Sequence, residues 1–245
     1  TAAFVDEDHD GTLRMRSVSV DRARPGELEL ARWAGLARQP GQVRARLRDV
    51  MAQERIARAF FSGFRHALEH LAGAIRAPLD EAQRHDIALR VMLRLVVLYF
   101  LQARGALDGE RRYLAGRLER ARRGERDFWQ ETLRPLFFGA LNRPRAARAA
   151  RARALGRMPF LNGGLFEPSP LEREHPDLGW RNEVWAPILD DFFERHRFAM
   201  REPIGADEHD AIDPEALGKV FEGLMYGSAR RDSGSFYTPR PLVRR

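Results

Sequence analysis

The sequence contains no cysteine, which excludes disulfide bonds and thiolate metal sites. Lysine is almost absent as well: Lys219 is the only one, although 42 basic residues against 35 acidic residues give a formal net charge of +7. A nuclease site of the carboxylate–carboxylate–lysine kind needs a lysine beside its metal-binding acids. Lys219 instead follows Glu215 on a predicted helix, so we do not expect such a nuclease site. The charge points toward an anionic partner such as nucleic acid. The dominance of arginine and alanine, however, is also typical of a GC-rich coding background.

The sequence also lacks a segment that could cross a membrane. Its longest purely apolar run covers only residues 95–101, whereas a spanning helix needs about 20 residues. The first five residues are followed at once by Asp6, which does not fit a signal peptide. We therefore expect no membrane association and a cytoplasmic location. Because the first residue is threonine, we also expect the sequence to be a piece of a longer protein.

Hydrophobic residues recur with helical spacing along most of the chain. This pattern predicts a mainly α fold, an irregular multi-helix bundle with minor short strands. The predicted helices cover residues 27–37, 42–76, 80–104, 110–122, 127–133, 136–141, 143–157, 180–196 (as 180–185 followed by 188–196) and 213–227, and short strands are predicted near 13–20 and 198–200. We divide the chain into an N-terminal arm with a short strand (1–26), a helical domain (27–212), and a linker helix with a closing motif (213–245).

Arg94 lies inside the most apolar predicted helix, 80–104. A buried guanidinium needs a partner because an unpaired charge in an apolar interior is costly. We therefore expect a structural salt bridge from Arg94 to a neighbouring helix.

Two groups of residues could be taken for metal sites. His66, Glu69 and His70 fit the H-x-x-E-H pattern of inverted zinc peptidases. The predicted helix that contains them, 42–76, has an apolar stripe formed by Phe60, Phe64, Leu68, Leu71 and Ile75. On a helical wheel both histidines lie about 200° to 240° from Phe64, so a solvated face is favoured for them. The acidic cluster of Asp190, Asp191 and Glu194 is also expected on a solvated face, because adjacent aspartates on a helix point apart. We predict no metal site.

Arginines are concentrated in the predicted helix 143–157, at positions 143, 145, 148, 151, 153 and 157. They scatter around the helix instead of lining one face. The segment could contact DNA phosphates, or it could be a solvated and partly mobile segment.

The closing segment, residues 233–239, combines a glycine, two aromatic residues and a helix start. Thr238 is expected at the N-cap and Pro239 at the first helical position. A helix N-terminus favours a carboxylate, and the faces of Phe236 and Tyr237 suit an organic cation such as a sulfonium. S-adenosylmethionine carries both groups. The alternative interpretation is an ordinary turn into a helix.

Four stretches in this order and spacing resemble one family. They are residues 94–105, 159–167, 214–222 and 234–239, and they are similar to the region ahead of the catalytic core in large adenine-specific DNA methyltransferases. These enzymes belong to single-chain (type IIG) restriction–modification and BREX-type phage-exclusion systems. The resemblance implies S-adenosylmethionine as cofactor, double-stranded DNA as partner, and methylation of adenine N6 at specific sites by the parent protein. It also implies that the residues on the cofactor side are Gly234, Phe236, Tyr237, Thr238 and Pro239.

The chain departs from that family in one large respect. Neither an acidic residue followed by the Gly-x-Gly cofactor loop nor the catalytic Asn-Pro-Pro-Tyr motif occurs after the closing segment. We therefore expect the Rossmann-like catalytic domain not to be included, no catalytic residue in this chain, and no methylation by these residues alone. The alternative function is a non-catalytic helical adaptor that binds DNA or partner proteins.

Overall fold

The computed structural model describes residues 2–7, 13–18, 43–161, 163–198 and 211–212 of the chain. The predicted helices 27–37 and 213–227 lie outside the described residues. The same is true of Lys219 and of the predicted cofactor residues Gly234, Phe236, Tyr237, Thr238 and Pro239.

The chain divides into two compact units. One comprises Arg58–Ile204 with Ala211–Asp213, and the other comprises Thr1–Ala57, Gly205–Asp210 and Pro214–Arg245. The domain boundaries given above from the sequence remain predictions.

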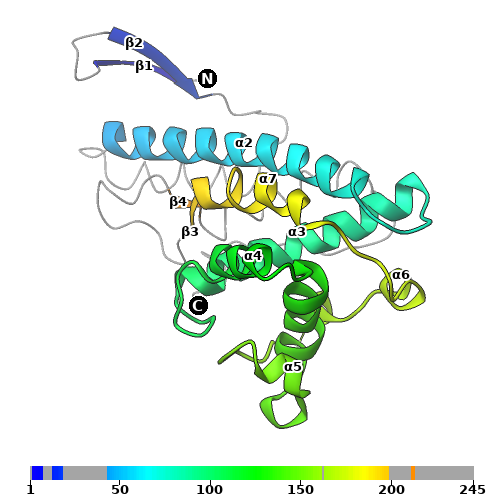
Figure 1. Ribbon diagram of the computed structural model, residues 1–245. Coiled ribbons are helices and arrows are strands. Elements are labelled where there is room, and N and C mark those ends of the chain that lie inside the picture. The colour runs from blue at the N-terminus through cyan, green and yellow to red at the C-terminus, as the bar shows by residue number, and fades with distance from the viewer. Residues whose placement is uncertain (1, 8–12, 19–42, 162, 199–210, 213–245) are drawn as a thin grey trace. The chain divides into compact units, whose positions relative to one another are not determined.

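The described part of the chain is mainly helical, as predicted (Figure 1). The α-helices are α2 (Val43–Gly73), α3 (Glu81–Ala103), α4 (Tyr113–Arg123), α5 (Ala150–Arg153), α6 (Pro170–Glu174) and α7 (Trp185–Leu189). The π-helices are η2 (Trp129–Leu133) and η3 (Leu136–Leu141), and the 3₁₀ turns are η4 (Arg145–Ala147), η5 (Gly164–Phe166), η6 (Asn182–Val184) and η7 (Phe193–Arg195). The strands are β1 (Ala2–Glu7), β2 (Leu13–Val18), β3 (Arg197–Phe198) and β4 (Ala211–Ile212).

The strands form two separate pairs. β1 and β2 pair antiparallel, with Ala2 opposite Val18 and Glu7 opposite Leu13, and β3 pairs with β4 in parallel. The predicted strand at 13–20 is thus confirmed over β2. Its partner β1 was not predicted from the sequence.

Helix α3 begins and ends within one residue of the predicted bounds, 80–104. The Asp80 side chain accepts from the backbone N–H of Gln83, whose own side chain accepts from the N–H of Asp80, and this capping box starts the helix. At the other end Gly105 takes a φ of +68°, which a residue with a side chain rarely adopts. Buried residues lie on most of the surface of α3, so it is a central helix.

Aromatic side chains fill much of the core. Trp129 and Trp180 pack edge to face with ring centroids 4.6 Å apart, and Trp185 lies against both. The indole of Trp180 donates to the carbonyl of Leu71 at 2.8 Å, which joins α2 to the segment after α6. A buried stripe on α2 and just beyond it consists of Phe60, Phe64, Leu68, Leu71 and Ile75, as predicted.

The structure corrects the prediction of a helix break at Pro135. Helical backbone continues through Pro135, because η2 and η3 are joined by Arg134 and Pro135 in right-handed helical conformation. An α-helix would leave the carbonyl of Glu131 without a partner, since proline has no N–H. The backbone ahead of Pro135 does not follow the α pattern: the N–H of Arg134 donates to the carbonyl of Trp129, five residues earlier, which is the π pattern.

The buried residues in this stretch recur every four positions. They form the pairs Phe128–Trp129, Thr132–Leu133, Leu136–Phe137 and Ala140–Leu141. In an α-helix such a stripe would drift by about 40° at each repeat. The wider π turns offset the drift, so the stripe stays on the core.

Two other predicted helices are broken. Residues 143–157 contain only the turn η4 and the single helical turn α5, separated by Arg148 and Ala149 in extended conformation. Residues 180–196 form η6, α7 and η7 instead of one helix, and the consecutive Phe192 and Phe193 are both buried. Their rings lie 5.0 Å from Phe60 and 4.5 Å from Tyr99, respectively, between centroids.

Candidate nucleic-acid interface

One stretch of the chain carries positive charge without any acidic residue. Between Glu131 and Glu167 the sequence has no aspartate or glutamate, but it has seven arginines, at positions 134, 143, 145, 148, 151, 153 and 157. Clustered arginines without acidic neighbours are the electrostatic signature of a phosphate-binding surface. This stretch includes η3, α5 and the loop that follows.

Most of these arginines are exposed and have no acidic partner. Within the described part of the chain, no ion pair is formed by Arg143, Arg145, Arg151, Arg153 or Arg157. We call this set of five exposed residues, which spans η4, α5 and the residues on either side of them, the arginine face. Their guanidinium groups remain available to anionic ligands, and each carries five N–H donors.

Arg148 differs from its neighbours because it is buried. Its guanidinium donates to the carbonyls of Arg143, Met158 and Pro159, at 3.0, 3.0 and 3.1 Å. Burial lowers the pKa of Arg148, and the nearby charge of Arg145 lowers it further. One side chain thus joins the two ends of the arginine-rich segment, and the extended backbone at Arg148 lets its side chain reach inward.

The far end of the segment is fixed to the turn before α4. The Asp108 carboxylate accepts from the backbone N–H of Arg157 at 2.9 Å, and the N–H of Asp108 donates to the Arg157 carbonyl at 2.9 Å. The hydroxyl of Tyr113 donates to the Leu155 carbonyl at 2.8 Å, and burial raises the pKa of Tyr113 to about 12. The arginine face therefore has a defined backbone position.

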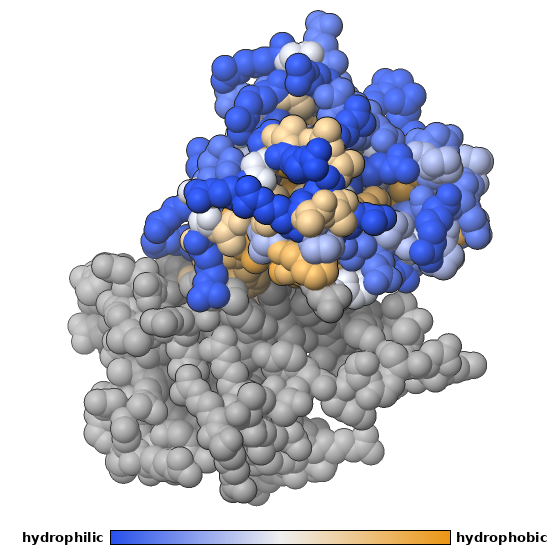
Figure 2. Space-filling view, turned by 90° about the horizontal axis from the view of Figure 1, so that it is seen from below, coloured by the Kyte–Doolittle hydropathy of each residue, from blue (hydrophilic) through white to orange (hydrophobic). Residues whose placement is uncertain are grey.

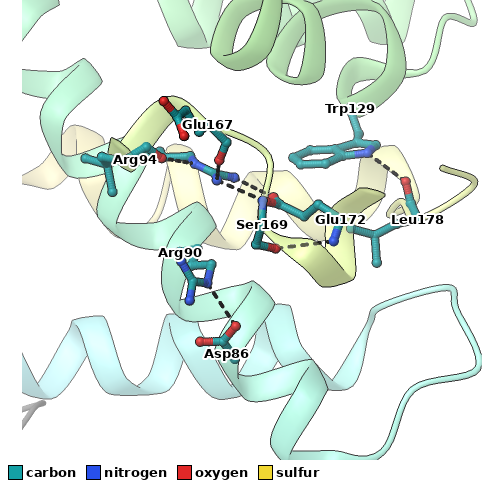
Figure 3. A network of polar contacts seen from close by, with 9 residues as sticks. Asp86, Arg90, Arg94, Trp129, Glu167, Ser169, Glu172 and Leu178 are labelled. Atoms are coloured by element: carbon teal, nitrogen blue, oxygen red, sulfur yellow. Dashed lines mark hydrogen bonds and ion pairs between the residues drawn. The ribbon is translucent and has the colours of Figure 1, made fainter. Parts of the chain in front are cut away.

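Arg94 fixes the loop that follows the arginine face (Figure 3). It pairs with the Glu172 carboxylate at 2.5 and 3.0 Å, and both side chains are only 1% exposed. The same guanidinium donates to the carbonyls of Leu165 and Glu167, at 2.7 and 2.9 Å. Glu172 also accepts from the N–H of Ser169, which caps α6. The predicted salt bridge from Arg94 to a neighbouring helix is thus confirmed.

This network brings together two of the stretches that carry the family resemblance. Arg94 begins the stretch 94–105 on α3, and the carbonyls that it holds belong to the stretch 159–167. The remaining two stretches, 214–222 and 234–239, lie outside the described residues.

A shallow groove of about 380 Å³ lies beside this network. Its lining consists of Gln130, Arg134, Pro135, Phe138, Gly139, Arg151 and Pro168. The side chain of Phe138 lies 5.0 Å from the Arg94 guanidinium, measured to the ring centroid. Gly139 permits the close approach of α5, because a Cβ there would lie 3.0 Å from that of Ala152.

Figure 2 shows apolar side chains gathered in the middle of an otherwise hydrophilic face of the described residues. Among those residues the large exposed hydrophobic side chains are Phe160 and Leu165, with exposed fractions of 45% and 37%. Both belong to the loop that follows α5.

The predicted solvated faces are confirmed for most of the residues that could be taken for metal ligands. His66, Glu69 and His70 are exposed, and no metal-binding group of histidine and acidic residues occurs in the described ranges. Asp190 and Asp191 pair with Arg122 and Arg195, at 3.7 and 3.2 Å.

Glu194 does not lie on a solvated face, contrary to the prediction. Its side chain is only 15% exposed and accepts from Arg112 at 2.9 Å and from the Tyr99 hydroxyl at 3.1 Å. The break in the helix before η7 turns Glu194 toward Tyr99 on α3. Burial and the nearby Glu194 carboxylate raise the pKa of Tyr99 well above its usual value.

The arginine positions were identified from the sequence, but the geometry of the face was not. Its clearest sequence signal is the absence of aspartate and glutamate from residues 132–166, which distinguishes this stretch from an ordinary solvated helix with mixed charges. The role of Arg148 had no such signal, because a buried arginine and an exposed one look alike in sequence.

The chain is similar to a protein of Methanocaldococcus jannaschii named "Putative type II restriction enzyme and methyltransferase", with 28% identity over 183 residues. The alignment covers 71% of this chain and 15% of the length of that relative. The similarity supports a relationship to methyltransferases of restriction–modification systems.

No protein-family model and no solved structure matches the chain. Among the described residues, no helix has the length and hydropathy required to cross a bilayer.

Proposed function

We propose that this chain is the helical region of a restriction–modification DNA methyltransferase, and that its arginine face contacts the phosphate backbone of double-stranded DNA. The observation that carries the proposal is the set of five exposed arginines without ion pairs in an acid-free stretch. The similarity to a relative named as a restriction enzyme and methyltransferase supports it.

In this proposal the methyl transfer belongs to a longer protein. S-adenosylmethionine would be the cofactor, adenine N6 the methylated atom, and a type IIG or BREX-type system the context, in the cytoplasm. Gly234, Phe236, Tyr237, Thr238 and Pro239 would hold the methionine end of the cofactor. The helical region would brace the catalytic domain and add affinity for DNA.

The salt dependence of DNA binding tests the role of the arginine face. Each phosphate contact releases counterions, so the slope of log K against log salt concentration is about −0.9 per contact. The triple variant Arg145→Ala/Arg151→Ala/Arg153→Ala should bind duplex DNA more weakly and flatten this slope by about 2 to 3. Fluorescence anisotropy over a range of salt concentrations measures both quantities.

A matched control removes the same net charge elsewhere. Arg65, Arg104 and Arg173 are also exposed and without ion pairs in the described part of the chain. The triple variant Arg65→Ala/Arg104→Ala/Arg173→Ala should retain most of the affinity and the slope. Equal losses in the two variants, or no loss in either, would contradict a specific arginine face.

A further inference from the structure

Phe160 exposes a large aromatic side chain to solvent. It is 45% exposed, while Met158 and Phe166 on the same loop are 8% and 2% exposed. A single exposed apolar residue is ordinary on a protein surface. Phe160 is distinguished by the way in which its backbone is fixed and by the charge of the sequence segment that contains it.

The backbone on both sides of Phe160 is anchored. On one side the carbonyls of Met158 and Pro159 accept from Arg148, at 3.0 and 3.1 Å. On the other side the N–H of Leu161 donates to the Leu141 carbonyl at the end of η3, at 2.8 Å. Phe160 therefore lies between two fixed points, and little entropy remains to be lost when its ring contacts a ligand.

The same guanidinium fixes both Phe160 and the arginine face. Arg148 bonds to the carbonyl of Arg143 at the start of the arginine-rich segment as well as to the two carbonyls before Phe160. The aromatic side chain therefore extends from a loop that is tied directly to the exposed arginines.

The charge of the sequence segment that contains Phe160 favours nucleic acid over a protein partner. No acidic residue lies between Glu131 and Glu167, so a protein docked on this loop would have to supply all the negative charge for the unpaired arginines. Duplex DNA supplies a phosphate about every 1.7 Å of its axis and offers base faces for an aromatic ring.

We infer that Phe160 is an apolar wedge that stacks against or inserts between the bases of the DNA held by the arginine face. The inference rests on the proposed DNA contact and adds to it a contact with the bases. Proteins that deform duplexes use such apolar wedges together with basic residues.

The two kinds of contact respond differently to salt. Phosphate contacts release counterions, whereas stacking of a neutral ring does not. The Phe160→Ala variant should therefore bind duplex DNA about tenfold more weakly with an unchanged salt slope. Phe160→Trp should retain the affinity, because its ring can still stack.

The fluorescence of 2-aminopurine placed in a duplex reports the base contact directly, because unstacking raises its emission. The 245-residue chain should raise this emission on binding, and Phe160→Ala should lose the increase. Because the chain contains no Asn-Pro-Pro-Tyr motif, such an increase cannot come from a catalytic base-flipping site. Leu165→Ala is the control: it removes an exposed apolar side chain from the same loop and should leave emission and affinity unchanged.

The outcomes separate this inference from the proposed function. If the arginine triple variant flattens the salt slope while Phe160→Ala changes neither affinity nor emission, the wedge is wrong and the DNA contact stands. If the arginine triple variant has no effect, the proposed DNA contact itself fails. If Phe160→Ala abolishes self-association of the chain in sedimentation and leaves DNA binding unchanged, the loop is a protein interface and the inference is overturned. Thermal melting monitored by circular dichroism confirms that each variant is folded.

Discussion

Arg94 joins parts of the chain that are far apart in sequence. Its guanidinium links α3 to Glu172, 78 residues later, and to two carbonyls of the intervening loop. All three nitrogens of its planar guanidinium donate hydrogen bonds, an arrangement that a lysine could not reproduce. A buried pair of this kind is costly to break because the remaining charge loses its partner.

Removing one member of the pair should therefore be strongly destabilising. We expect Arg94→Met to lower the free energy of unfolding by about 3 to 5 kcal/mol, since the Glu172 carboxylate would be left unpaired in the core. The double variant Arg94→Met/Glu172→Met should be less destabilised than the sum of the single variants. Urea unfolding followed by circular dichroism measures each value.

Helix α3 offers a matched exposed pair. Arg90 and Asp86 lie 2.8 Å apart with side chains 45% and 43% exposed. Arg90→Met should lower the free energy of unfolding by less than about 1 kcal/mol, because an exposed pair is well hydrated in the folded state and contributes little. Similar losses for Arg90→Met and Arg94→Met would contradict the structural role of Arg94.

At the scale of elements, the predictions hold where local signals decide the structure. The capping residue Asp80 and the terminal Gly105 define α3 from nearby sequence alone. The stripe on α2 follows from simple helical periodicity. These features require no knowledge of distant contacts, so the sequence was sufficient to predict them.

The predictions fail where a distant contact overrides the local pattern. The segment 143–157 has the composition of a helix, yet Arg148 turns inward to carbonyls at both ends of the segment. The sequence predicted that Arg94 has a partner, but it could not identify Glu172. The candidate site was thus predicted as a set of arginines, and its shape required the structure.

Gly156 is the position at which the arginine-rich segment meets its anchor. Its φ is +103°, and a Cβ there would collide with the carboxylate of Asp108. Gly156→Ala should lower the free energy of unfolding by about 2 to 4 kcal/mol, because it combines backbone strain with displacement of the Asp108 hydrogen bond. Thermal and urea unfolding provide the measurement.

Gly163 is the control for this change. It lies nearby in sequence and has an extended φ of −164°, and a Cβ there would meet no atom within 4 Å beyond its own chain neighbours. Gly163→Ala should change stability by less than about 0.5 kcal/mol. An equally mild Gly156→Ala would show that the anchor at Asp108 tolerates a side chain.

At the scale of the whole molecule, the chain lacks the Asn-Pro-Pro-Tyr motif that the family resemblance would lead one to expect in a complete enzyme. We expect no methyl transfer to duplex DNA by the 245-residue chain, because no Asn-Pro-Pro-Tyr is present to hold an adenine. Incubation with tritiated S-adenosylmethionine and duplex DNA measures this, with an active DNA methyltransferase as the positive control. Time-dependent incorporation of label by this chain would refute the expectation.

The repeat of four between Phe128 and Leu141 has a consequence for comparing related sequences. With four residues per turn, each residue advances the helix by about 90°, so a deletion or insertion of one residue would rotate every later side chain by that angle. Leu136, Phe137, Ala140 and Leu141 would then leave the core together. Relatives that share this packing should therefore align through the stretch without a gap, even where the surrounding loops differ in length.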